Sequence, residues 1–325
     1  GAGKPELSPE NIIGILSLIF WSLIIVVSVK YMAFILRADN RGEGGILALM
    51  ALAAQKGEIT RKFNLSLVIM MGLFGAALLY GDGMITPAIT VLGAVEGLKI
   101  ATPVFAQYVV PISITILVFL FLVQRAGSGR IGIVFGPIMM VWFVTLGILG
   151  VSAIAKNPAV FEALNPLHAV EFFFRNQKLG FVVLGDVLLV ITGAEALYAD
   201  LGHFGGKPIR WAWFGLVLPS LIINYFGQGA LILKTCAGKA QCSMHPFYDQ
   251  VPHAWLIPMV VLAGVASIIA SQAVISGAFS IARQGIQLGF LPRMQVVHTS
   301  HRAEGQIYLP AVNWTLLILV LIVVL

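Results

Sequence analysis

Residues 73–98 read LFGAALLYGDGMITPAITVLGAVEGL, an apolar stretch with Asp82 near its middle, Pro87 five residues later and Glu96 near its end. About 20 apolar residues suffice for a helix to cross about 30 Å of hydrocarbon. A charged side chain at the centre of such a span costs about 2.5–3.5 kcal/mol on insertion scales. The stretch therefore predicts a membrane helix whose carboxylate faces a partner or a cavity.

The composition predicts the same class for the whole chain. Only 10% of the 325 residues are charged and 59% are hydrophobic, whereas soluble domains carry about 25% charged residues. The long apolar runs lack the alternation of a membrane barrel, and backbone amides in lipid must be satisfied within a helix. We predict an all-α, multi-pass protein of the cell inner membrane or plasma membrane, with residues 1–325 as a single transmembrane transporter domain. The predicted spans are 12–36, 65–97, 108–124, 131–155, 179–200, 211–234, 254–282 and 306–325.

The net charge of +6 follows the predicted topology. Thirteen of the twenty Lys and Arg residues fall in the loops, or at the adjoining span ends, on one alternate side of the membrane, and that side is expected to be cytoplasmic. The basic balance therefore implies no nucleic-acid partner. Because residues 1–11 would then lie outside, we expect at least one more span before residue 1 and further chain after residue 325.

Two cysteines, Cys236 and Cys242, fall in the predicted outer loop 235–253. A disulfide between them is compatible with an oxidising compartment, and two unpaired thiols are an equal alternative. No zinc site is expected, because the sequence has no CxxC and its six histidines lack ligand spacing relative to the cysteines.

The hydropathy pattern indicates an inverted repeat. Loop 37–64 and loop 235–253 lie five spans apart, on opposite predicted faces. Each leads into a long span with polar residues, containing GDGMITPAIT in one case and ASQAVISGAFSIARQ in the other. This is typical of a five-plus-five transporter with its substrate site near the bilayer midplane.

Three oxygen-bearing side chains share one face of the predicted span 65–97. Asp82, Thr86 and Thr90 are spaced i, i+4 and i+8. Pro87 has no amide proton, so the carbonyl of Gly83 loses its helical donor. A carboxylate, two hydroxyls and a freed carbonyl suit a hard cation. The alternative is a proline kink with a protonated Asp82 bonded to a neighbouring helix.

A polar interruption divides the span 179–200. Thr192, Gly193, Ala194 and Glu195 follow an apolar run, and a discontinuous helix of this kind exposes backbone carbonyls to an ion. Glu195 could take up and release a proton within the physiological range. The alternative is a packing glycine, with Glu195 near the cytoplasmic interface.

Other acidic residues are weaker candidates. Glu96 is expected near the external surface, as a site residue or a solvated residue at the mouth. Asp186, in the outer half of its span, could pair with a lysine or line an outer vestibule. Asp200 is expected at an interface or in a loop.

Polar residues in two further segments have structural interpretations. Asn40 and Glu43 have capping-box spacing, which predicts a cytoplasmic helix over 43–55. Ser267 and Ser271 are small residues expected to serve close helix packing.

The stretch YGDGMITPAITVLGAVEGL at 80–98 resembles the KUP/HAK/KT family of potassium uptake permeases, as do segments 30–53, 191–213, 224–234 and 269–300. The resemblance implies the LeuT-like fold of the amino-acid–polyamine–cation superfamily, with ten core helices in two inverted repeats. It implies secondary active potassium uptake by K⁺/H⁺ symport and alternating access. The resemblance also implies that the family's first core helix, with its GDIGTSPLY-like motif, and its last core helix are missing from residues 1–325.

The resemblance also implies roles for single residues. Asp82 matches the acidic position of the third family helix, where Glu is common, and Glu195 matches the acidic residue of the broken sixth helix. Glu195 is the first candidate for proton coupling and Asp82 the second. The implied K⁺ ligands are Asp82, Thr86, Thr90 and Thr192. The implied partners are K⁺, protons and lipid, with no cofactor and with a homodimer left open.

One more match concerns the loop 37–64. Glu43 matches the family's acidic residue in the cytoplasmic loop, which makes it a further candidate beside its capping interpretation.

Three other classes of protein share some of these features. A proton-coupled amino-acid transporter of the same fold is disfavoured because Asp82 and Glu195 would repel a substrate carboxylate. An intramembrane aspartyl protease needs two membrane aspartates, but its GxGD motif is missing: the chain reads LYGD at 79–82 and VLGD at 183–186. We therefore predict that the protein is not an enzyme. A channel is left open by the site chemistry, whereas the repeat and the titratable site favour alternating access.

Overall fold

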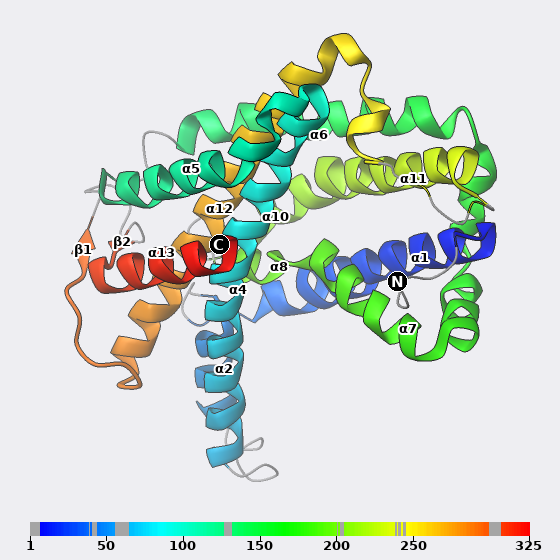
Figure 1. Ribbon diagram of the computed structural model, residues 1–325. Coiled ribbons are helices and arrows are strands. Elements are labelled where there is room, and N and C mark those ends of the chain that lie inside the picture. The colour runs from blue at the N-terminus through cyan, green and yellow to red at the C-terminus, as the bar shows by residue number, and fades with distance from the viewer. Residues whose placement is uncertain are drawn as a thin grey trace. The chain divides into compact units, whose positions relative to one another are not determined.

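The computed structural model describes residues 7–298 and 307–325, apart from 39, 41–43, 56–64, 127–131, 200, 202–204, 238, 240–241 and 243–244. The described chain is almost entirely helical (Figure 1). Seven segments are long and apolar enough to cross a membrane: Pro9–Arg37, Leu65–Ile100, Val104–Val123, Val134–Ile154, Leu167–Ala199, Gly206–Thr235 and His253–Gln287. The eighth predicted span, 306–325, is a shorter apolar helix, Pro310–Val324. The prediction of an all-α, multi-pass membrane protein is confirmed.

The contacts divide the chain into two compact units. The first unit comprises Gly1–Met32, Met140–Thr192 and Arg210–Leu256, and the second comprises Ala33–Met139, Gly193–Ile209 and Ile257–Leu325. The chain passes from the first to the second unit between Thr192 and Gly193. The inverted repeat and the single transport domain both stay predictions.

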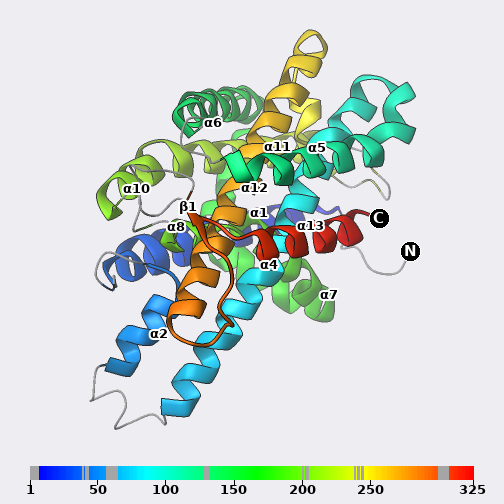
Figure 2. The same cartoon turned by 90° about the vertical axis from the view of Figure 1, so that its left-hand side faces the viewer.

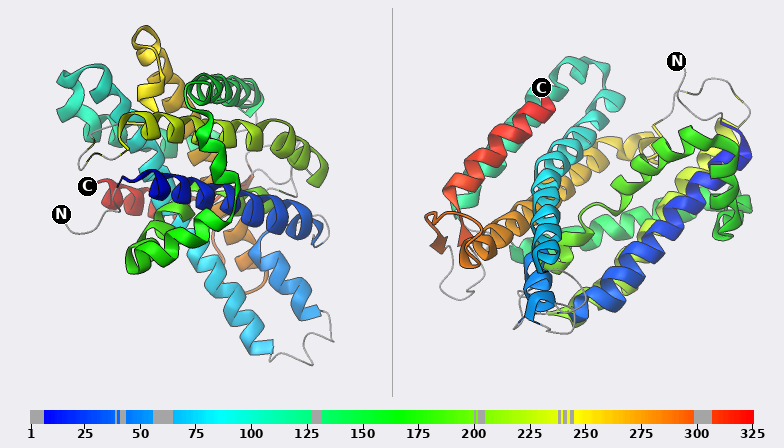
Figure 3. Two further views of the ribbon diagram at one scale, coloured as in Figure 1. Left: turned by 90° about the vertical axis from the view of Figure 1, so that its right-hand side faces the viewer. Right: turned by 90° about the horizontal axis from the view of Figure 1, so that it is seen from below.

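The first unit is built around the opening helix of the chain. The elements that lie wholly within it are α1 (Pro9–Ser22), η5 (Pro158–Leu164), α7 (Leu167–Ile191), η6 (Trp213–Val217), α11 (Leu218–Thr235), η7 (Tyr248–Gln250) and η8 (His253–Trp255). Other elements continue from one unit into the other, among them the π-helix η1 (Leu23–Phe34), α6 (Gly132–Ile154) and α10 (Gly206–Ala212). Helix α7 packs beside α1 (Figure 3), where Leu18 meets Phe172 and Val187 in a buried cluster. This packing buries one face of α7 as far as Val187.

Helix α7 begins earlier than the predicted start at residue 179. Its first segment is amphipathic and buries Phe172 against Gly14, where an added Cβ would lie 2.7 Å from the Phe172 Cβ. Gln177 has a φ of 42° inside the helix, so the segment before it and the apolar segment after it run in different directions. Sequence hydropathy detected only the second segment, because Arg175 and Lys178 interrupt the apolar run.

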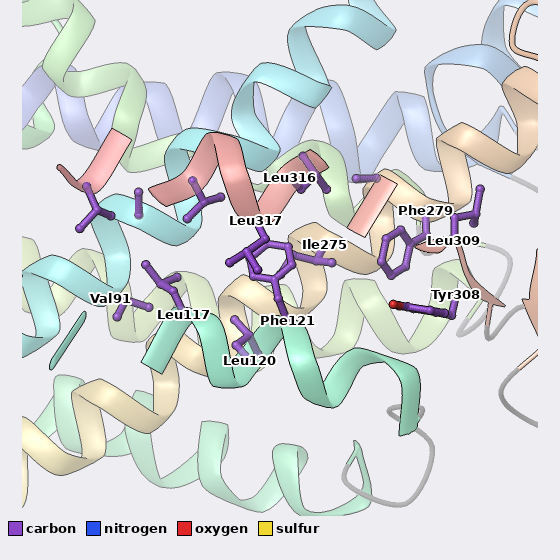
Figure 4. Close-up of a cluster of buried hydrophobic side chains, with 14 of the residues drawn as sticks. Val91, Leu117, Leu120, Phe121, Ile275, Phe279, Tyr308, Leu309, Leu316 and Leu317 are labelled. Carbon is purple, nitrogen blue, oxygen red and sulfur yellow. The ribbon is translucent and has the colours of Figure 1, made fainter. Parts of the chain in front are cut away.

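The second unit contains the helix with the central carboxylate. Its elements are η2 (Ile35–Arg37), α2 (Ile46–Gln55), α4 (Leu65–Ala101), η3 (Pro103–Tyr108), α5 (Val109–Val123), η4 (Gln124–Ala126), α8 (Ala194–Ala199), α12 (Leu256–Gln287), β1 (Val297–His298), β2 (Ile307–Tyr308) and α13 (Pro310–Val324). The two short strands pair antiparallel, with Val297 opposite Tyr308. Figure 4 shows the core of this unit, in which Phe121 of α5, Ile275 of α12 and Leu316 of α13 interlock.

Helix α2 starts later than predicted. The capping-box spacing predicts a helix over 43–55, but α2 begins at Ile46. Gly45 has a φ of 103°, a conformation that cannot continue a right-handed helix. Glu43 lies outside the described residues. Figures 1 and 2 show α2 beside the first half of α4, where Met50 packs on Gly72.

The two cysteines form a disulfide. Cys236, at the end of α11, is bonded to Cys242, and their Cα atoms lie 5.6 Å apart. The structure thereby decides between the two alternatives that the sequence left open. The bridge closes a short loop within the first unit.

Candidate functional site

Asp82 lies on α4 with its carboxylate half-buried. Thr86, one turn later, donates a hydrogen bond from Oγ1 to Asp82 Oδ1 at 2.6 Å. Thr90, a further turn on, donates from Oγ1 to the carbonyl of Thr86 at 2.7 Å. Pro87 stands inside the helix between them and supplies no amide proton to the carbonyl of Gly83. The predicted column of oxygen atoms is therefore present on one face of α4.

The predicted helix break is present at Thr192 and Gly193. Helix α7 ends at Ile191, Thr192 has a ψ of 140°, and Gly193 has a φ of 86°. Only glycine adopts such a φ without steric cost. Helix α8 then begins at Ala194. The glycine thus starts a new short helix whose second residue is Glu195.

The second unit brings Glu195 and Asp82 together. The half-buried carboxyl of Glu195 interacts with that of Asp82 electrostatically and through a side-chain hydrogen bond. It also interacts with the backbone amides of Gly193 and of Glu195 itself. Two carboxyl groups can share a hydrogen bond only when one of them carries a proton. The structure therefore brings two half-buried carboxyl groups, one on α4 and one on α8, into contact with each other.

Helix α12 borders this pair. Tyr80, two residues before Asp82, donates from its hydroxyl to the carbonyl of Ala278 at 3.2 Å. The Thr90 hydroxyl lies 3.4 Å from that of Ser271, and Ser271 donates to the carbonyl of Ser267 at 2.7 Å. These contacts fix the register of α4 against α12. Ser271 was expected only to allow close packing, and nothing in its sequence spacing indicated Thr90 as its partner.

The remaining predicted residues lie elsewhere. Thr192 belongs to the first unit, at the end of α7, and its hydroxyl donates to the carbonyl of Leu188 at 3.1 Å. The side chains of Glu96 on α4 and Asp186 on α7 are exposed. Glu43 and Asp200 fall outside the described residues. The structure therefore joins Asp82, Thr86, Thr90 and Glu195, while the roles of the others stay predictions.

The chemistry of this group is that of oxygen ligands. Among the described residues, no three His, Cys, Asp or Glu side chains gather as a metal site. Hard cations are bound by carboxylate, hydroxyl and carbonyl oxygens, and selectivity depends on cavity size and ligand geometry. The oxygen atoms around Asp82 are of the type that hard cations prefer, and a role of these residues in ion binding stays a prediction.

Comparison with known proteins covers the whole chain. Residues 1–325 match the family described as "K+ potassium transporter integral membrane domain". The chain is 59% identical over 326 residues to "Probable potassium transport system protein Kup" of Myxococcus xanthus, covering 100% of this chain and 49% of that protein. It is 55% identical over 325 residues to "Probable potassium transport system protein Kup 3" of Dechloromonas aromatica, covering 100% and 51%. It is 57% identical over 318 residues to "Probable potassium transport system protein Kup 1" of Geobacter sulfurreducens, covering 98% and 50%.

The chain thus spans about half the length of these curated relatives. Their names describe transport proteins and not enzymes. No solved structure matches the chain.

Proposed function

The chain belongs to the K⁺ potassium transporter family, and from this premise we propose that it forms the ion-binding core of a potassium uptake system driven by proton symport. The printed names of its relatives describe potassium transport. The observation that carries the proposal is the hydrogen-bonded pair of Asp82 and Glu195 carboxyls on α4 and α8.

The charge of this pair links potassium to protons. Two carboxyls that share one proton have a net charge of −1, which a single K⁺ neutralises. With K⁺ bound and no proton, the pair would keep a charge of −1 inside the span. A charge at that depth costs about 2.5–3.5 kcal/mol on insertion scales. Joint loading of K⁺ and H⁺ is therefore the arrangement that moves most easily across the membrane.

Each residue has a role in this scheme. Asp82 holds K⁺ through its carboxylate, and the hydroxyl oxygens of Thr86 and Thr90 replace part of the water shell of the ion. Glu195 carries the coupled proton. Thr192 is a fourth proposed ligand, on the strength of the family resemblance. The hydrogen bond from Thr86 to Asp82 supports these roles, because it leaves the hydroxyl oxygen able to face a cation.

Alternating access is the proposed transport mode. Outward-facing protein binds K⁺ and a proton, and movement of one repeat against the other releases both to the cytoplasm. The break at Thr192 and Gly193 supports this mode, since Gly193 with its φ of 86° can change backbone direction at little steric cost. The amino-acid transporter alternative is not favoured, because the relatives are named for potassium.

Uptake of ⁸⁶Rb⁺ into proteoliposomes tests the proposal. The full-length protein is reconstituted, and uptake is measured with and without an inward proton gradient, with protein-free liposomes as the control. Gradient-stimulated uptake that K⁺ suppresses is the expected result. Rb⁺ uptake that is the same with and without the gradient would contradict proton symport. Proton-driven accumulation of an amino acid without Rb⁺ uptake would contradict potassium as the substrate.

A further inference from the structure

The far end of α8 is held by the backbone of the loop before α2. A Cβ added to Gly44 would lie 2.0 Å from the carbonyl oxygen of Tyr198 and 2.9 Å from the Cβ of Leu201. Only a residue without a side chain fits against α8 at this distance. The loop backbone at Gly44 is therefore in direct contact with the last turn of the broken helix.

Two side-chain hydrogen bonds hold the backbone of this loop. Gln284 of α12 donates from Nε2 to the carbonyl of Gly44 at 2.9 Å. The Tyr198 hydroxyl donates to the carbonyl of Ala38 at 2.5 Å. These bonds join residues 240 and 160 positions apart in the sequence, so they connect α12 and α8 to one short loop.

The contact is close, but one buried hydrogen-bond acceptor in it lacks a partner among the described residues. The Oε1 atom of Gln284 is buried and has no hydrogen-bond partner among the described residues. A buried acceptor without a partner costs free energy that water would restore on opening.

Helix α8 connects the loop to the carboxyl pair. Glu195 and Ala199 are four residues apart on one helix face. Glu195 interacts with Asp82 at one end, and a Cβ at Gly45 would lie 3.8 Å from the Ala199 Cα at the other. Because α8 has only six residues, a shift at Tyr198 must displace Glu195 as well.

We propose that Tyr198 and Gln284 are positioning residues that lock the loop backbone at Ala38 and Gly44 onto α8. The lock keeps Glu195 beside Asp82, and its release opens α8 to the cytoplasm so that the ion and the proton can leave. This inference deepens the proposed function and rests on it for the identity of the ions. The lock itself is a property of contacts within the second unit.

Thiol labelling tests the lock without measuring transport. In the full-length protein with Cys236→Ser and Cys242→Ser, Ala196→Cys places a reporter on α8, where Ala196 is half-buried. A membrane-impermeant maleimide is applied to inside-out vesicles, and the labelling rate is recorded. Tyr198→Phe and Gln284→Leu remove one hydrogen bond each with little change of volume. Gly44→Ala pushes the contact apart by its Cβ.

Each lock variant is expected to raise the labelling rate about fivefold, the change in an equilibrium that loss of one ordinary hydrogen bond produces. Gly44→Ala should raise it at least as much. Tyr308→Phe is the matched control, because Tyr308 is a buried tyrosine of the same unit that packs on Phe279, away from α8. The control should leave the rate unchanged.

A second measurement distinguishes the proposed positioning role from a general loosening of the fold. If the variants only loosened the fold, a reporter thiol at Ala76→Cys, buried under α2 on α4, would also label faster. Selective labelling at position 196 supports the lock, and equal increases at both positions or no increase at position 196 overturn it. If the lock is confirmed while the wild-type protein takes up no Rb⁺, the proposed function fails and the lock stands.

Discussion

The hydroxyl groups of Thr90 on α4 and Ser271 on α12 lie 3.4 Å apart, and Ser271 is completely buried. The Thr90 hydroxyl also donates a hydrogen bond to the carbonyl of Thr86 at 2.7 Å. The Thr86 hydroxyl in turn donates a hydrogen bond to the Asp82 carboxylate. Ser271 is therefore connected through two threonines to the central carboxylate. The contact places α12 in a position to influence the proposed ion ligands.

A double-mutant cycle of Thr90→Val and Ser271→Ala measures this contact. Each hydroxyl already donates its proton to a carbonyl of its own helix. The expected coupling energy, from thermal unfolding in detergent, is therefore below the average of about 0.6 kcal/mol for a hydrogen bond between membrane helices. Thr115→Val serves as the control, because its hydroxyl donates to the carbonyl of Pro111 in its own helix. Strict additivity of Thr90→Val and Ser271→Ala would show that the two hydroxyls do not interact.

Neutral replacement of the paired carboxyls separates the ion from the proton. Asp82→Asn is expected to lower ⁸⁶Rb⁺ uptake about tenfold or more, since a hydrogen bond or ligand bond to a charged group contributes about 1.5–3 kcal/mol. Glu195→Gln should make uptake independent of external pH, whereas wild-type uptake should rise as the pH falls and Glu195 becomes protonated.

Exposed Glu96 on the same helix provides the matched control for this pair. Glu96→Gln should keep both the rate and the pH dependence of the wild type. The proposed roles are wrong if Asp82→Asn and Glu195→Gln each retain wild-type uptake with its normal response to pH.

The sequence predicted much of the local structure around the carboxyl pair. Helical spacing alone aligned Asp82 with Thr86, and a glycine within an apolar run indicated the break at Gly193. Both are short-range features, determined within about two helical turns. Both features follow from the local backbone conformation, which depends on residues nearby in the sequence.

Contacts between distant segments could not be predicted in this way. Nothing in the spacing of Gly44 or Gln284 showed that they would meet, although they are hydrogen-bonded across 240 positions. The start of α2 was misplaced because a favourable capping spacing was outweighed by the positive φ of Gly45. The disulfide between Cys236 and Cys242 was equally undecided, because pairing depends on the direction in which the loop folds.

Gly150 provides a test of helix packing in the first unit. A Cβ at this position would lie 2.3 Å from the carbonyl oxygen of Ile223 on α11, and a Cβ at Gly227 on α11 would lie 2.6 Å from the Gly150 Cα. Gly150→Ala should therefore lower the free energy of unfolding by about 1–3 kcal/mol, the usual cost of overpacking. Thermal unfolding in detergent followed by size-exclusion chromatography would measure it.

The control for this substitution lies on the same helix. A Cβ at Gly136 of α6 would meet no atom within 4 Å, so Gly136→Ala should not destabilise the protein. Equal stability of the Gly150 and Gly136 variants would mean that α6 and α11 do not cross at Gly150.

The disulfide between Cys236 and Cys242 allows tests of thermal stability and of membrane topology. It closes a loop with a sequence separation of 6 residues, and restricting so short a loop in the unfolded chain contributes about 2 kcal/mol in the chain-entropy model. Cys236→Ser with Cys242→Ser should lower thermal stability accordingly.

Because the loop is predicted to be external, an impermeant reductant added to intact cells should make both thiols reactive to an impermeant maleimide. The variant lacking both cysteines should stay unlabelled, and labelling of the native chain only in inside-out vesicles would reverse the predicted orientation of every span.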